Sequence, residues 1–114
     1  MKRAYVAGPY RADTEHGVVE NIRRAGDVSL ELWKLGFAAL CPHMNTALFG
    51  GAANDDVWLA GDLEWLQFAE LVVLVPGWRG SAGTLLEKRT AEHLGIPVYE
   101  WETDLIAICR LATE

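Results

Sequence analysis

The sequence predicts a three-layer α/β domain, in which a parallel sheet of four to five strands carries helices on both faces. Short apolar segments alternate with longer segments of helical periodicity along the chain, with short connections between them, and this alternation is typical of parallel sheets. Residues 71–75 form a continuous apolar run, as expected of a central strand that helices cover on both sides. The chain has 114 residues, 51% of them hydrophobic and 23% charged, which fits one globular domain spanning 1–114.

Strands and helices are expected to alternate from one end of the chain to the other. We expect strands over residues 3–7, 37–41, 71–75 and 96–99, and helices over residues 14–35, 55–68, 81–94 and 103–111. Asp13 or Thr14 can cap the start of the first helix, and Gly36 can end it in a left-handed conformation. Residues 45–54 are rich in Gly, Ala and Asn and are predicted to form a loop long enough to act as a lid. A flavodoxin-like or Rossmann-like arrangement is the expected result.

The overall charge argues against polymeric nucleic acid as a partner. The 10 basic residues stand against 16 acidic ones, with a net charge of −6, whereas nucleic-acid binding relies on clustered Lys and Arg. A small phosphorylated ligand needs only a local site and is compatible with this charge.

Cysteine and histidine usage, together with hydropathy, narrows the protein class further. Cys41 and Cys109 lack the spacing of a disulfide framework, and no segment is long and apolar enough for a signal peptide or a membrane span. We therefore expect a cytoplasmic protein without a membrane partner. His16, His43 and His93 lack metal-ligand spacing, so no metal and no cofactor are expected.

A ligand is expected at one edge of the sheet, because ligands of parallel sheets bind outside the carboxyl ends of the strands. Those ends are formed by Gly8-Pro9-Tyr10, Pro42-His43-Met44 and Pro76-Gly77-Trp78. Gly8, Pro9 and Tyr10 are expected to contact the ligand, and His43 is expected to line the pocket. Trp78 could stack on a base or, alternatively, cover the edge of the core.

Asp62 is the strongest local anomaly in the sequence. It falls within the apolar stripe of the second predicted helix, which is formed by Trp58, Leu59, Trp65, Leu66 and Ala69. A carboxylate on such a stripe is costly unless it is paired or protonated. The interpretation stays open between a buried Asp that caps a loop or pairs with an arginine and a site carboxylate with a shifted pKa.

The segment from Gly80 to Glu87 is the second candidate. It follows a core strand and opens a helix that Ser81 can cap, while Gly83 lets a ligand approach the free backbone N–H groups. Glu87 lies one turn after Gly83 on the same helix face and would project toward the same ligand. The alternatives are an ordinary capped helix and a surface glutamate. Neither a P-loop nor a GxGxxG motif is present.

Three blocks of the sequence carry a likeness to a known family. They are Tyr5-Val6-Ala7-Gly8-Pro9, Asp62-Leu63-Glu64-Trp65-Leu66-Gln67 with Ala69 and Val72-Val73, and Ser81-x-Gly83-x3-Glu87. In order and spacing the chain resembles the nucleoside 2-deoxyribosyltransferase superfamily across almost its whole length. Within that superfamily it is most similar to the 2′-deoxynucleoside 5′-phosphate N-hydrolases and to small phage and bacterial relatives.

The resemblance implies a role for each matching position. Glu87 would attack C1′ of the sugar, Asp62 would hold the site and assist departure of the base, and Tyr5, by position alone a core residue, would orient Glu87. Ser81 and nearby amides, with Gly83, would bind a 5′-phosphate, and Gly8 would let the backbone approach the ligand. The resemblance also implies a homodimer.

These roles lead us to expect an N-glycosidase that cleaves the base–sugar bond of a nucleoside 5′-monophosphate or nucleoside, through a glutamate nucleophile and an oxocarbenium-like transition state. The short C-terminus favours hydrolysis over deoxyribosyl transfer. The stretch Leu85-Leu86-Glu87-Lys88 differs from the Tyr-Glu-Leu-Gly or Met-Glu-Leu-Gly pattern of the characterised enzymes, which favours a sensor, whereas the presence of Tyr5, Asp62 and Glu87 together favours an enzyme. A nucleotide-binding sensor without turnover and a phage structural protein without a pocket are the alternatives from other classes.

Overall fold

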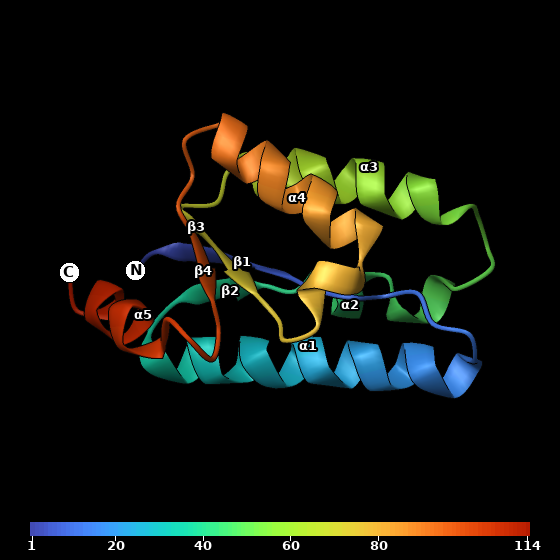
Figure 1. The fold of residues 1–114 in the computed structure, drawn as a ribbon, viewed down its shortest axis with the longest axis horizontal. Helices are drawn as coiled ribbons and strands as arrows, with labels where there is room; N and C mark the ends of the chain where they lie inside the picture. Colours follow the sequence, from blue (N-terminus) through green and yellow to red (C-terminus); the bar gives the residue numbers. More distant parts are fainter.

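The computed structural model describes residues 1–114 and confirms the predicted class, with a parallel sheet lying between two layers of helices (Figure 1). The strands are β1 (Arg3–Ala7), β2 (Ala38–Leu40), β3 (Leu71–Leu74) and β4 (Val98–Glu100). The α-helices are α1 (Glu15–Leu35), α2 (Pro42–Asn45), α3 (Asp55–Leu66), α4 (Ala82–His93) and α5 (Leu105–Ala112). Two 3₁₀ helices, η1 (Ala47–Phe49) and η2 (Trp78–Gly80), complete the list.

The sheet has four strands in the order β2-β1-β3-β4, and every neighbouring pair is parallel. The chain first moves outward from β1 to β2, and then crosses back to place β3 on the other side of β1. The strand order therefore reverses between β1 and β3, which is where doubly wound sheets open a crevice for ligands.

Alternation along β1 divides the core between the two faces of the sheet. Ala4 and Val6 belong to a buried cluster with side chains of α1 and α5. Tyr5 and Ala7 point to the opposite face, where they pack in a second cluster with residues of α3 and α4. This two-residue period directs the Tyr5 side chain toward α4, whose sequence contains Glu87.

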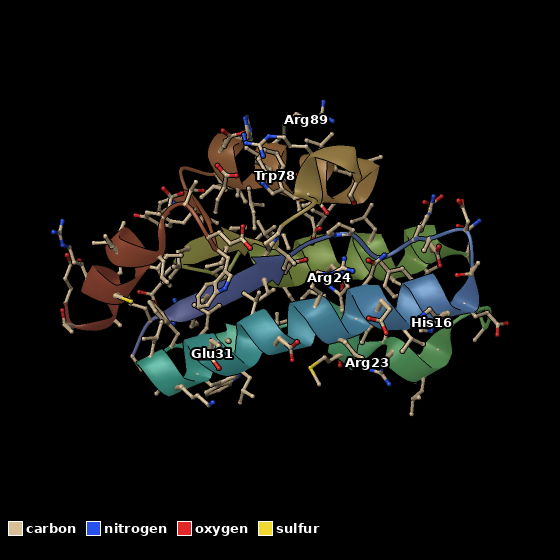
Figure 2. The ribbon with its side chains drawn as sticks, turned by 60° about the horizontal axis from the view of Figure 1, so that its bottom comes forward. His16, Arg23, Arg24, Glu31, Trp78 and Arg89 are labelled. Atoms are coloured by element: carbon tan, nitrogen blue, oxygen red, sulfur yellow. The ribbon has the colours of Figure 1, made fainter.

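Helix α1 begins and ends as its sequence predicts. The Thr14 hydroxyl accepts a hydrogen bond from the Gly17 amide at 3.0 Å, and Gly36, with φ of 104°, ends the helix in the left-handed region. Figure 2 shows His16, Arg23 and Glu31 along α1, with Trp78 apart from them beside α4.

The boundaries differ from the prediction where the backbone finds other partners. Residues 42–49 are not simply a strand end followed by an open loop, because α2 and η1 form there, with Pro42 in the first turn of α2. Strand β4 begins at Val98 rather than at residue 96, because the Ile96 amide bonds to the Ala91 carbonyl at 2.8 Å and Pro97 has no N–H to donate.

The predicted apolar stripe of α3 is wrong in one respect. Trp65 is 58% exposed, and Leu66 is the only residue of the helix that is fully buried. Because α4 lies beside α3 on the same face of the sheet (Figure 1), only a narrow side of α3 faces the core. Asp62 therefore does not lie in the middle of a buried stripe.

Candidate active site

A pocket of about 460 Å³ lies at the carboxyl end of β1, enclosed by the β1–α1 loop and by residues of α2, α3 and α4. This volume falls within the range of small-molecule sites. Its walls are formed by Gly8, Pro9, Tyr10, Arg11, Pro42, His43, Thr46, Asp55, Asp56, Trp58, Leu59, Asp62, Gly80, Ser81, Ala82, Gly83, Thr84, Leu86 and Glu87. Most of the expected site residues are thus brought together; Tyr5 lies behind the wall, and Trp78 lies elsewhere.

Glu87 is a buried residue of α4, only 6% exposed, and is therefore not the surface glutamate that its local sequence allows. The hydroxyl of Tyr5 donates a hydrogen bond to Oε2 of Glu87. Burial raises the pKa of Glu87 to about 8, while the bond from Tyr5 lowers that pKa and the charge of Asp62 raises it. Burial and the neighbouring Glu87 raise the pKa of Tyr5, so the phenol keeps its proton and stays a donor.

Asp62 is half-buried on α3 and lines the same pocket as Glu87. Burial raises the pKa of its carboxyl to about 6. No ion pair involves Asp62, and no hydrogen bond of its side chain is present. The explanation of Asp62 as a loop cap or an arginine partner is therefore wrong, and its carboxyl remains available to a ligand.

The turn that opens α4 presents free backbone donors to the pocket. The Ser81 hydroxyl accepts bonds from the Thr84 amide at 3.2 Å and the Thr84 hydroxyl at 2.8 Å, which confirms Ser81 as the N-cap. The amides of Ala82 and Gly83 have no acceptor within the chain, as is usual for the first turn of a helix. A side chain at Gly83 would meet only Leu59, at 4.0 Å, so this part of the wall is open.

Gly8 lines the pocket, but its lack of a side chain has another cause than ligand approach. A Cβ atom at this position would lie 2.6 Å from Cβ of Val75, which is closer than packed carbon atoms tolerate. The glycine is therefore required by the close packing of the ends of β1 and β3. The role that the resemblance implies for Gly8 is not needed to explain it.

His43 holds the wall of the pocket rather than presenting a free imidazole. Its Nε2 lies 2.9 Å from the Pro9 carbonyl, so this nitrogen carries the proton and donates. Nδ1 is buried without a partner, and burial lowers the pKa of His43, which keeps the ring neutral. Tyr10 packs edge-on against it, with ring centroids 5.8 Å apart.

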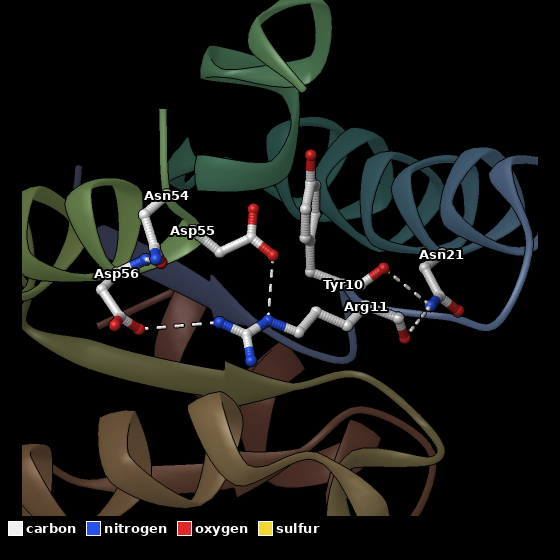
Figure 3. Close-up of polar contacts among 6 residues, drawn as sticks. All are labelled: Tyr10, Arg11, Asn21, Asn54, Asp55 and Asp56. Carbon is white, nitrogen blue, oxygen red and sulfur yellow. Dashed lines mark hydrogen bonds and ion pairs between the residues drawn. The ribbon is translucent and has the colours of Figure 1, made fainter. Parts of the chain in front are cut away.

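An ion-pair cluster at the pocket wall is a feature that the sequence reasoning missed (Figure 3). Nε of Arg11 lies 2.9 Å from Oδ2 of Asp55, and its Nη2 lies 3.6 Å from Oδ1 of Asp56. Nδ2 of Asn21 donates to the carbonyls of Tyr10 and Arg11 at 3.0 and 3.3 Å. These contacts join the β1–α1 loop to the start of α3. The adjacent Asp55 and Asp56 at the start of the predicted helix were the sequence signal that could have revealed this cluster.

Trp58 also lines the pocket, although the sequence indicated it only as part of the apolar stripe of the helix. Its indole Nε1 is buried and has no acceptor, and its ring packs against Phe49 of η1 with centroids 5.7 Å apart. An unpartnered buried donor costs free energy unless a ligand or a water accepts from it.

The interpretation of Trp78 as a stacking platform for a base is wrong for this pocket. Its Nε1 donates to Oε1 of Glu100 at 3.0 Å, and the Arg79 guanidinium lies 4.5 Å from the ring centroid. Trp78 lines a separate cavity of about 270 Å³ beyond β3 and β4. It is almost fully buried, and so covers the edge of the core.

Two further properties bear on the class of site. No group of three or more His, Cys, Asp and Glu side chains is arranged to hold a metal ion. None of the helices combines the length and the apolar character that crossing a bilayer requires.

Similarity to known proteins reaches the family level. Curated proteins of known identity give no significant match. The family model described as "Domain of unknown function (DUF1937)" matches residues 2–103, which include every strand, helices α1 to α4 and all the residues that line the pocket. The chain therefore belongs to the DUF1937 family.

Proposed function

We propose that the protein hydrolyses the N-glycosidic bond of a nucleoside or nucleoside 5′-monophosphate, with Glu87 as the nucleophile. The observation that carries the proposal is the buried Tyr5–Glu87 pair, in the same pocket as the unpaired carboxyl of Asp62. Burying a carboxyl against a phenol costs stability, whereas two carboxyls with separated pKa values suit acid–base and nucleophilic chemistry.

The reaction would use the two carboxyls in two steps. Glu87 attacks C1′ as the C1′–N bond breaks, and Asp62 gives a proton to the departing base, so that a glycosyl ester forms on Glu87. Water then attacks C1′, Asp62 takes its proton, and Glu87 leaves as the carboxylate. The Tyr5 hydroxyl donates to Glu87 throughout and favours its ionised form.

The protonation state of the pair sets the pH at which this can happen. The pKa values of about 6 for Asp62 and about 8 for Glu87 mean that the pair holds a single proton between these limits. By these values the shared proton rests mainly on Glu87, and the reactive form is the tautomer in which Asp62 carries the proton and Glu87, bonded to the Tyr5 hydroxyl, is ionised. The rate of base release should therefore be bell-shaped in pH, with limbs near 6 and 8.

Base release, measured by chromatography after incubation with a panel of nucleosides and their 5′-monophosphates, tests the proposal. Glu87→Gln keeps the size of the side chain and removes the nucleophile, so activity should fall by about 10³-fold or more. Glu92→Gln makes the same chemical change on the exposed side of α4 and should leave the rate unchanged. Tight binding of a ligand without release of base would instead indicate a sensor.

A further inference from the structure

The charges around the pocket are unlike those of a phosphate site. Four carboxyl side chains line it, those of Asp55, Asp56, Asp62 and Glu87, against the single guanidinium of Arg11 and no lysine. His43 adds no positive charge, because burial lowers its pKa. Phosphate sites usually gather arginine or lysine instead.

The one cation on the wall is already engaged. Arg11 contacts Asp55 at 2.9 Å and Asp56 at 3.6 Å (Figure 3). Turning Arg11 toward a phosphate would remove its positive charge from both carboxylates. Their repulsion of the incoming anion would then grow as the guanidinium moved.

The basic residues closest in sequence to the α4 turn and to Glu87 face away from the pocket. Arg79, next to Gly80, pairs with Glu100 at 3.3 Å. Lys88, next to Glu87, pairs with Glu92 at 3.2 Å. Neither Arg79 nor Lys88 is among the residues that line the pocket.

The groups left to bind the 5′ end of a ligand are neutral. They are the free amides of Ala82 and Gly83 and the hydroxyl of Ser81. A helix N-terminus supplies about half a positive charge, whereas a phosphate monoester brings about two negative charges at neutral pH. These donors are sufficient for a hydroxyl oxygen but do not offset a phosphate among the carboxyls.

We infer that the substrate is an unphosphorylated nucleoside, whose 5′-hydroxyl meets the Ser81–Gly83 turn, and that the carboxyls of the pocket disfavour the corresponding 5′-monophosphate. This assignment rests on the proposed function and narrows its substrate class. The ion-pair cluster of Arg11, Asp55 and Asp56 then acts as an electrostatic filter, because its carboxylates repel a phosphate that enters the pocket.

A matched pair of substrates with the same base tests this preference. The kcat/KM for base release should be higher for the nucleoside than for its 5′-monophosphate by roughly tenfold or more at low ionic strength. The ratio should shrink as added salt screens the carboxyls. A higher kcat/KM for the monophosphate would overturn the inference and leave the glycosidase proposal standing.

Binding of the same pair separates this inference from the proposed activity. Calorimetry with the Glu87→Gln variant requires no turnover and should give tighter binding of the nucleoside. Tighter binding of the monophosphate, or no binding of either compound, would overturn the inference. Absence of base release from both compounds, with tighter nucleoside binding, would refute the glycosidase activity while supporting the choice of ligand.

A charge-neutralising variant identifies the source of the preference. Asp56 is largely exposed and makes only the longer contact to Arg11, so Asp56→Asn should spare the fold. Asp56→Asn should reduce the ratio of kcat/KM between the nucleoside and its 5′-monophosphate severalfold, mainly through a lower KM for the monophosphate. Asp27→Asn, on the exposed surface of α1, should leave this ratio unchanged. If this kcat/KM ratio is also unchanged in Asp56→Asn, the ion-pair cluster is not the source of the preference for the nucleoside.

Discussion

The contact between Tyr5 and Glu87 joins a strand residue to a helix residue 82 positions away. The phenol provides a donor that stays protonated and fills a buried site between β1 and α4. The carboxyl provides the negative charge that the proposed chemistry needs. Each side chain explains why the other is buried, since a lone hydroxyl or a lone carboxyl in that place would be unsatisfied.

Replacing Tyr5 by Phe should change the titration of Glu87 while keeping the packing. The lost hydrogen bond lowers the pKa of Glu87 in the native protein, so that pKa should rise further in Tyr5→Phe. A bond to a charged acceptor contributes about 1.5–3 kcal/mol, so kcat/KM at neutral pH should fall roughly ten- to a hundredfold. The pH profile of base release checks this: the limb near 8 should move to higher pH. A merely structural Tyr5 would lower stability and leave the limb in place.

Two glycines of the pocket should respond in opposite ways to the same substitution. Gly8→Ala puts a Cβ atom 2.6 Å from Val75, and overpacking of this kind costs about 1–3 kcal/mol. Gly83→Ala meets only an ordinary contact with Leu59 and gains helix propensity, so stability should hold or rise by up to about 1 kcal/mol.

The activities of these variants complete the comparison. If the ligand approaches the backbone at Gly83, Gly83→Ala should raise KM severalfold at unchanged or higher Tm. Thermal unfolding and steady-state kinetics on both variants provide the measurements. An Ala at Gly83 without effect on KM would show that the ligand does not reach this turn.

At the scale of elements, α3 and α4 lie side by side on one face of the sheet (Figure 1), and they contribute Asp62 and Glu87, the two carboxyls of the proposed chemistry, to one pocket. The start of α4 was predictable because a serine N-cap has a local sequence pattern. The exposure of Trp65 was not predictable. The helical period identifies the apolar side of α3, but it does not show that the neighbouring α4 limits the contact of α3 with the sheet.

Ser81 combines the cap of α4 with the edge of the pocket, and two substitutions separate these roles. Ser81→Ala should destabilise the protein by about 1 kcal/mol through loss of the cap. Ser81→Asp restores a good N-cap and should recover most of that stability, as measured by urea unfolding. It also adds a negative charge beside the substrate, so its kcat/KM should be lower than that of the native protein. Recovery of full activity in Ser81→Asp would argue against a ligand contact at this position.

For the whole molecule, the α/β class and the edge that carries the pocket follow from the order of segments, because parallel sheets bring all strand ends to one side. The meeting of residues 5, 62 and 87 was anticipated only through a family resemblance, since no local pattern encodes it. Arg11 and Asp55, 44 positions apart, escaped prediction because exposed ion pairs leave no trace in hydrophobic periodicity. Trp78 was misplaced because a strand end alone does not say which of two neighbouring cavities a side chain enters.

The buried carboxyl of Glu87 should make the stability of the whole domain fall as pH rises. Its pKa is about 8 in the folded protein and near its ordinary value of 4.5 when unfolded, so the folded state binds more protons between these limits. The free energy of unfolding then decreases with rising pH, by up to about 1.4 kcal/mol per pH unit for one group.

The interval from pH 7 to pH 8 isolates this effect. Asp62, with a folded pKa of about 6, has largely titrated below it. His43, whose pKa burial lowers, is neutral in the folded protein, so its titration in the unfolded chain can only raise stability with pH. Cys41, with a pKa raised to about 11, is not yet ionised in the folded protein. Urea unfolding across the interval should show a falling stability for the native protein and for Glu92→Gln. The fall should disappear in Glu87→Gln, which has no proton to lose; a fall that persists there would place the titrating group elsewhere.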